Sequence, residues 1–122
     1  MTDKVVNLTY GGTIAYPTDI DINITTTNLN ASNAVYLMDV YTVVYNPGSN
    51  GMASKDIVYL ERVGGSNTIY GSDNVWSKGT TITVDAFAPS SNILRIRIGI
   101  TPSIGSAPYR CFITAYAKDS TA

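Results

Sequence analysis

The sequence has no histidine, and this absence removes several kinds of chemistry. Histidine is the commonest general base and the commonest metal ligand in proteins. Serine and cysteine triads of the usual kind cannot be built without it. Glu61 with Arg62, Lys78 and Asp85 could form an acid–base pair, but nothing in their spacing brings them together. We therefore expect no catalytic residues, no cofactor and no metal ion, and we predict that the protein is not an enzyme.

Cysteine and charge are also scarce. The single cysteine, Cys111, has no partner for an internal disulfide, and we predict that it is a small buried residue on a strand. Charged residues make up only 14% of the chain, against about 25% in a typical soluble domain. The 8 Lys and Arg nearly balance the 9 Asp and Glu, which gives a net charge of −1. Without a positive field to attract a phosphate backbone, nucleic-acid binding is not expected.

Long apolar segments are missing as well. No stretch approaches the roughly 18 apolar residues of a membrane-spanning helix. Residues 1–7 lack the apolar run of a signal peptide. We therefore expect a protein that is made in the cytosol and does not insert into a membrane. The 122 residues suit a single domain, 1–122, and the 44% hydrophobic content is sufficient for a core.

The pattern that is present has a period of two residues, which is typical of half-buried strands. Segment 18–25, for example, puts Ile20, Ile22 and Ile24 on one face. Turn-forming residues separate the alternating segments, including Gly11 with Gly12 and the segment 71–74. The segments predicted as strands are 5–10, 18–25, 35–45, 57–63, 81–86, 94–100 and 109–118, with a short extra strand at 68–70.

Strands at this spacing predict an all-β protein with little or no helix. The expected fold is a two-sheet antiparallel β-sandwich, jelly-roll-like, with about seven to nine strands. The predicted core consists of Ile22, Leu37, Leu60, Ile82, Val84, Ile96, Ile98 and Ile113.

The last two predicted strands allow a more specific expectation if they form a hairpin. Arg95 and Arg97 would then lie on the outer face beside Phe112 and Tyr116, with cation–π contacts covering the rings. The residues expected to face the core are Leu94, Ile96, Ile98, Ile100, Tyr109, Cys111, Ile113 and Ala115.

The acidic segment around Asp19, Asp21 and Asn23 begins like a calcium-binding EF-hand loop but does not continue as one. Ile24 stands where the loop needs glycine, and Asn30 stands where it needs a bidentate glutamate. A strand also spaces alternate oxygens too far apart to converge on one ion. We interpret this segment as a solvated polar face.

The nine tyrosines are the strongest compositional signal. In segment 35–45 both alternating faces carry large apolar or aromatic side chains, whereas a strand buried on one side should have a polar second face. Either this strand is covered on both sides within the fold, or its outer face meets another chain. Tyrosine suits such a contact because it has a large area, few rotamers and a polar tip. Low surface charge favours association as well.

Trp76 and Tyr70 lie in a segment rich in Gly, Ser and Asn that we predict to contain a loop. Aromatic side chains beside Asn and Asp are typical of sugar-binding surfaces and also of protein interfaces. A third possibility is that Trp76 only closes one end of the sandwich.

These features favour a non-enzymatic structural or assembly protein. By analogy of fold and composition, we predict a small virion component that forms homo-oligomers or binds other virion proteins. It could be a minor capsid protein, a cement or decoration protein, or the head of a spike or fibre. The alternative is a lectin-like module that binds carbohydrate through Tyr70 and Trp76. The predicted interface residues are Tyr36, Met38, Tyr41, Tyr45, Tyr70, Trp76, Arg95, Arg97, Phe112 and Tyr116.

Overall fold

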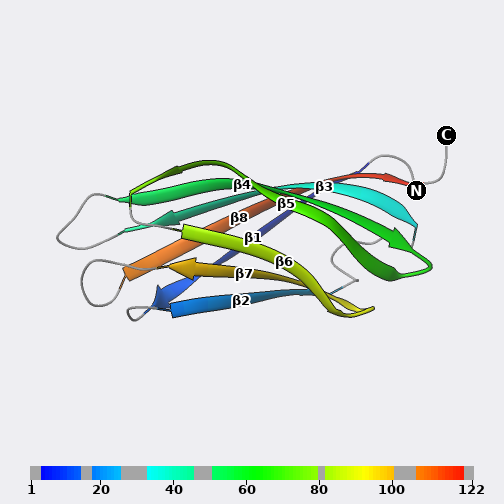
Figure 1. The fold of residues 1–122 in the computed structure, drawn as a ribbon, viewed down its shortest axis with the longest axis horizontal. Coiled ribbons are helices and arrows are strands. Elements are labelled where there is room, and N and C mark those ends of the chain that lie inside the picture. The colour runs from blue at the N-terminus through cyan, green and yellow to red at the C-terminus, as the bar shows by residue number, and fades with distance from the viewer. Residues whose placement is uncertain are drawn as a thin grey trace.

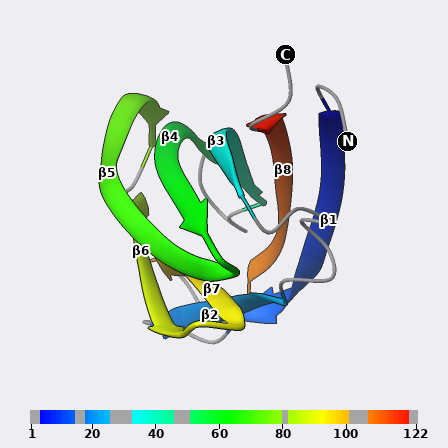
Figure 2. The same ribbon diagram turned by 90° about the vertical axis from the view of Figure 1, so that its right-hand side faces the viewer.

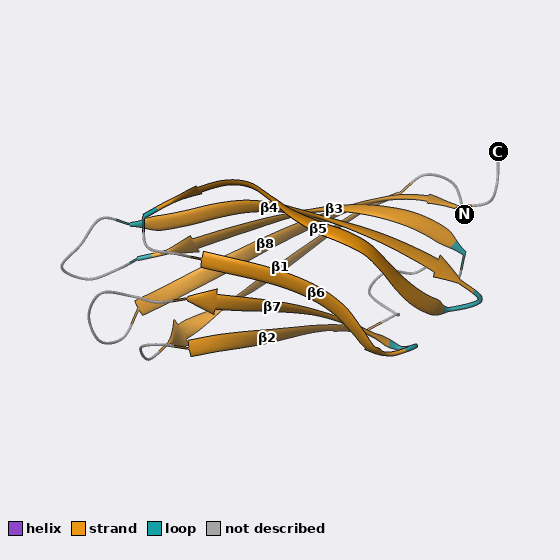
Figure 3. Ribbon diagram, in the orientation of Figure 1, coloured by secondary structure: helices purple, strands orange, loops and turns teal. Residues whose placement is uncertain are grey.

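The computed structural model describes residues 4–14, 18–25, 33–45, 51–79, 82–100 and 107–119. Within these ranges the regular structure consists of β-strands (Figure 3). They are β1 (Lys4–Ile14), β2 (Thr18–Thr25), β3 (Ala34–Val44), β4 (Met52–Val63), β5 (Ser66–Lys78), β6 (Ile82–Ser90), β7 (Ile93–Ile100) and β8 (Ala107–Asp119). The described part of the chain contains no helix of the length and apolarity that a membrane span requires.

The strands form two antiparallel sheets (Figure 1). The larger sheet has the order β1-β8-β3-β4-β5, and the smaller has the order β2-β7-β6. Viewed along the strands, the larger sheet arches over the smaller one (Figure 2). The first strand pairs with the last and the second strand with the second to last, which is a jelly-roll-like nesting. The predicted antiparallel β-sandwich is confirmed.

The core lies between the sheets and is built from alternate residues of each strand. Tyr36, Met38 and Val40 of β3 are each 0% exposed. The predicted core residues Ile22, Leu60, Ile82, Ile96, Ile98 and Ile113 are buried, and Val84 packs against them while partly exposed. Leu37 does not belong to the core, because the inward positions of β3 are the even-numbered ones and Leu37 points outward.

Strands β7 and β8 do not form the hairpin considered above. They belong to different sheets: β7 lies between β2 and β6, and β8 lies between β1 and β3. The inward residues were nevertheless predicted correctly, since Leu94, Ile96, Ile98 and Ile100 of β7 are buried. On β8 the inward residues Cys111, Ile113 and Ala115 are buried, and Tyr109 packs partly buried against the core. Alternation within a strand determines which side chains point to the core. Contacts between segments far apart in the sequence determine which strands pair.

Two predicted turns are parts of strands. β1 continues through Gly11 and Gly12 to Ile14, and β5 continues through residues 71–74. A Cβ at Gly11 would lie 3.0 Å from the Arg110 Nε atom, and one at Gly12 would lie 3.4 Å from the Tyr109 ring. Gly11 therefore leaves room for the Arg110 side chain of the neighbouring strand β8, whereas a Cβ at Gly12 would make an ordinary contact.

Candidate protein-contact surface

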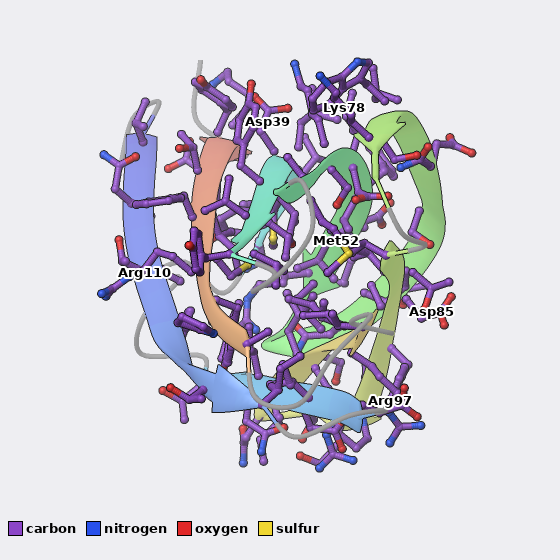
Figure 4. The ribbon with its side chains drawn as sticks, turned by 90° about the vertical axis from the view of Figure 1, so that its left-hand side faces the viewer. Asp39, Met52, Lys78, Asp85, Arg97 and Arg110 are labelled. Atoms are coloured by element: carbon purple, nitrogen blue, oxygen red, sulfur yellow. The ribbon has the colours of Figure 1, made fainter. Side chains whose placement is uncertain are left out.

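The candidate surface is the side of the larger sheet that points away from the smaller sheet, and we call it the outer face. It consists of the side chains of β1, β8, β3, β4 and β5 that point away from the core. On β3, Leu37, Tyr41 and Val43 are 46%, 42% and 43% exposed. Figure 4 shows Asp39 and Lys78 on this side of the molecule, Met52 between the sheets, and Arg97 pointing away on the opposite side.

The strand register arranges the outer face into rows that run across the sheet. Directly paired side chains in a sheet lie close enough to form continuous contacts. The first row contains Val5, Tyr116, Leu37 and Tyr59, contributed by β1, β8, β3 and β4. The second row contains Thr9, Phe112, Tyr41, Lys55 and Trp76, contributed by all five strands.

A more polar row separates these two. It contains Asn7, Thr114, Asp39, Ile57 and Asp73. The Thr114 hydroxyl donates to the Asn7 amide oxygen over 3.0 Å. The outer face thus combines apolar area with hydrogen-bonding groups, as the contact surfaces of proteins do.

Lys55 and Tyr41 form the centre of the second row. The Lys55 Nζ atom lies 5.3 Å from the centroid of the Tyr41 ring. Contact with Tyr41 and the nearby charge of Asp39 raise the pKa of Lys55 above its ordinary value, so the ammonium stays charged. Tyr41 stays 42% exposed beside this ammonium group.

A β-bulge places Trp76 in the second row. In the pairing of β5 with β4, Asp56 faces Asn74 but Lys55 faces Trp76, so Val75 is an extra residue without a partner. Asn74 points inward, because its amide donates to the buried Asp56 carboxylate over 3.1 Å. Without the extra residue, Trp76 would point inward too. The bulge therefore turns Trp76 outward beside Lys55, where it is 52% exposed.

The first row contains a shallow hollow. Leu37 of β3, Tyr59 of β4 and Tyr116 of β8 contribute to its lining, together with Lys118. The hollow has a volume of about 360 Å³ and its accessible surface is mainly apolar.

The ten predicted interface residues fall into four groups. Tyr41, Tyr45, Trp76, Phe112 and Tyr116 are exposed on or beside the larger sheet. Tyr36 and Met38 are wrong as interface residues, because the alternation of β3 points both into the core and leaves them 0% exposed. The backbone of Tyr70 is part of β5, but its side chain lies outside the described part of the structure.

Arg95 and Arg97 form the fourth group and lie on the outer side of the smaller sheet. Arg97 makes two hydrogen bonds to the Asp21 carboxylate, of 2.7 and 3.0 Å, and Arg95 bonds to Asn23 over 2.7 Å. Both guanidinium groups also lie over the ring of Phe87, at 5.7 and 5.0 Å from its centroid. The predicted contact with Phe112 and Tyr116 is therefore wrong, since those rings belong to the other sheet.

The interior of the described structure holds a small polar cluster. Asp56 is buried and accepts hydrogen bonds from Ser54 and Asn74. Cys111 is fully buried, as predicted, and burial raises its pKa to about 11. A thiol with this pKa is protonated at neutral pH and is not a nucleophile. Among the described residues, no three His, Cys, Asp or Glu side chains gather into a metal-binding group.

Comparisons with known proteins found a distant structural match and no match among protein families or curated proteins. No protein-family model matches the chain, and no curated protein matches it. Among solved structures, the chain aligns with the tailspike protein of Acinetobacter phage vB_ApiP_P1 at 18% identity and a TM-score of 0.33. The alignment covers 96% of this chain but 21% of the tailspike chain, so the chain spans about a fifth of that protein's length. A TM-score this low does not establish a shared fold.

Proposed function

We propose that the protein is a non-enzymatic structural module of a virion that assembles through the outer face of its larger sheet. Its first partner is a second copy of the same chain, and other virion proteins are further candidates. The charge-poor composition, rich in Thr, Ser, Asn and Tyr, supports a virion role by analogy. The location that follows is the virion.

One observation carries the assembly role: the two outer surfaces of the sandwich differ in character. Every exposed large hydrophobic side chain of the described residues lies on the larger sheet or, for Tyr45, directly after β3. The smaller sheet instead presents Arg95, Arg97 and Asp21, and its one large ring, Phe87, lies beneath the two arginines. The larger sheet thus carries the exposed large apolar side chains, with charged residues such as Lys55 and Asp73 among them. Exposed apolar side chains that gather on one side of a molecule are typical of a protein that covers that side with a partner.

The test introduces charge into the outer face without touching the core. Leu37→Lys with Val43→Glu changes two outward residues of β3 and leaves the net charge unchanged. The control is Thr83→Lys with Ser91→Glu, which places the same side chains on exposed positions of the smaller sheet and its turn. We expect wild type and control to sediment above monomer mass at high micromolar concentration, and the β3 variant to sediment at lower mass.

Two outcomes would overturn this proposal. One is a wild-type protein that stays monomeric at those concentrations. The other is a β3 variant with the same mass distribution as wild type, since a buried charge in the contact should weaken it strongly.

Carbohydrate binding remains the second candidate because Trp76 is an exposed aromatic platform on an edge strand. Its premise of a loop is lost, since Trp76 lies on β5. The neighbouring Asn74 amide also donates to Asp56 and to the Trp76 carbonyl group. A glycan that binds wild type but not Trp76→Ala, with the mass in solution unchanged, would favour this candidate over assembly.

A further inference from the structure

The two sheets have four edge strands, and three of them carry features that oppose pairing with another chain. Edge strands expose backbone N–H and C=O groups, and charges, prolines and bulges protect them from unwanted pairing. β2 carries Asp19 and Asp21. β5 carries two register shifts as well as Asp73 and Lys78. β6 carries Asp85, Pro89 and an irregular register before Ser90.

β1 is the exception. From Val5 to Ile14 it contains no charged residue and no proline. Its pairing with β8 continues without a register shift from Lys4 to Ile14. No described strand pairs with its other side. From Val5 onward β1 is therefore a long, regular and uncharged edge, the kind that accepts a further strand.

The hydrogen bonding of β3 identifies which backbone groups β1 exposes. The Tyr45 N–H donates to the Pro108 carbonyl oxygen over 3.0 Å. In an antiparallel ladder, successive residues direct their N–H and C=O groups alternately to one side and the other. The outward residues of β3 and β8 therefore bond to each other, and the inward residues of β8 bond to β1.

The same alternation applies to β1. Leu8 faces Ile113 of β8, so the inward residues of β1 direct their backbone groups to β8. The outward residues direct theirs to the free edge. Those residues are Val5, Asn7, Thr9, Gly11 and Thr13.

We propose that β1 pairs antiparallel with β1 of a second copy, around a two-fold axis at Thr9. This inference extends the proposed assembly role, because it adds a second contact to that of the outer face. Thr9 is the middle residue of β1, so this register uses the whole strand. It places Thr9 opposite itself, Asn7 opposite Gly11, and Val5 opposite Thr13.

Several features favour a second copy over a foreign strand. Two copies bring preformed strands of equal length, so neither must be ordered on binding. The register pairs no like charges, and a net charge of −1 per chain gives little repulsion between copies. Pairing would also join the larger sheets of both copies into one, with the two outer faces on the same side. The first row would then continue from Val5 into the second copy.

The test uses charges at the axis, on the outward side chain of Thr9. Thr9→Lys alone and Thr9→Glu alone would each place like charges directly opposite one another, which opposes pairing. An equimolar mixture of the two variants would place opposite charges there. The experiment is done with Leu37→Lys and Val43→Glu also present, so that contacts through the outer face are weakened. Thr9→Ser in the same background is the control.

The expected masses in sedimentation are a dimer for the control, monomers for each charged variant, and a dimer again for the mixture. Thr9→Pro is a second variant, because it removes an N–H that points to the free edge and leaves the ladder to β8 intact. With Leu37→Lys and Val43→Glu also present, the Thr9→Pro variant should be monomeric. Circular dichroism confirms that it is folded.

The possible failures of the two proposals differ. A monomeric control, or charged variants that dimerise as the control does, overturns the β1 contact and leaves the outer face to be judged by its own variant. The remaining case is that Thr9→Pro lowers the mass in solution while the Leu37→Lys and Val43→Glu substitutions leave it unchanged. This result overturns the outer-face proposal and supports the β1 contact.

Discussion

Asp56 is a carboxylate in the interior of a sandwich with few charges. It is 3% exposed and is held by Ser54 and Asn74. Burial raises its pKa above the ordinary value, and the two hydrogen bonds oppose that rise without cancelling it. The folded protein therefore binds a proton at Asp56 more readily than the unfolded chain does.

This difference predicts a pH dependence of stability. The contribution of protonated Asp56 is fully present below the unfolded pKa of about 3.9 and is lost as the pH rises through the raised folded pKa. We expect the free energy of unfolding of wild type, minus that of Asp56→Asn, to fall with rising pH across this window and then level off. Urea unfolding at a series of pH values measures it.

Asp21→Asn is the matched control with the opposite sign. The hydrogen bond from Arg97 lowers the pKa of Asp21, so its contribution is present above about pH 3.9 and is lost as the pH falls through the lowered value. A wild-type minus Asp56→Asn difference that is flat with pH, or that rises, would contradict the role given to Asp56.

Strand β3 illustrates what can be predicted from sequence at the level of an element. Alternation gives two faces, but both faces of β3 are apolar, so the pattern does not say which one is buried. The core contains the even-numbered residues, including Tyr36, and the outer face contains Leu37. That choice depends on the sheet that packs beneath β3, which local sequence does not encode.

The two faces of β3 should respond differently to truncation. Tyr36→Ala removes a fully buried ring and should lower the free energy of unfolding by about 3–5 kcal/mol. Leu37→Ala removes an exposed side chain and should change it by less than about 1 kcal/mol. Urea denaturation of dilute protein measures both. Equal losses for the two variants would place β3 differently from the arrangement described here.

The bulge at Val75 and the separation of β7 from β8 could not be predicted for a related reason. A single extra residue in β5 turns Trp76 from the inner to the outer side, and only the register with β4 reveals it. Likewise, Arg95 and Arg97 were correctly expected to lie outside the core, but their aromatic partner is Phe87 of β6, not Phe112 of β8. Periodicity predicts which side of a strand a side chain points to. The pairing of strands in the tertiary structure determines which side chains lie beside it.

The complete sandwich combines these elements into a molecule with two unlike outer surfaces. Composition and period predicted its two antiparallel sheets, and they predicted the all-strand structure of its described residues. They also indicated that tyrosine-bearing strands present an apolar outer face. The rows across five strands depend on the order of the larger sheet, which brings together β1, β8 and β3 from opposite ends of the chain. The candidate surface is therefore a product of topology as much as of sequence.

Hydroxyl-radical footprinting read by mass spectrometry, at high and low protein concentration, tests the use of the outer face most directly. Tyr41, Phe112 and Tyr116 are reactive rings that are 42%, 45% and 47% exposed in a single copy. We predict that all three are protected at high concentration and react on dilution, while Phe87 of the smaller sheet reacts equally at both. Reaction of the three rings to the same extent at both concentrations would contradict assembly through the outer face.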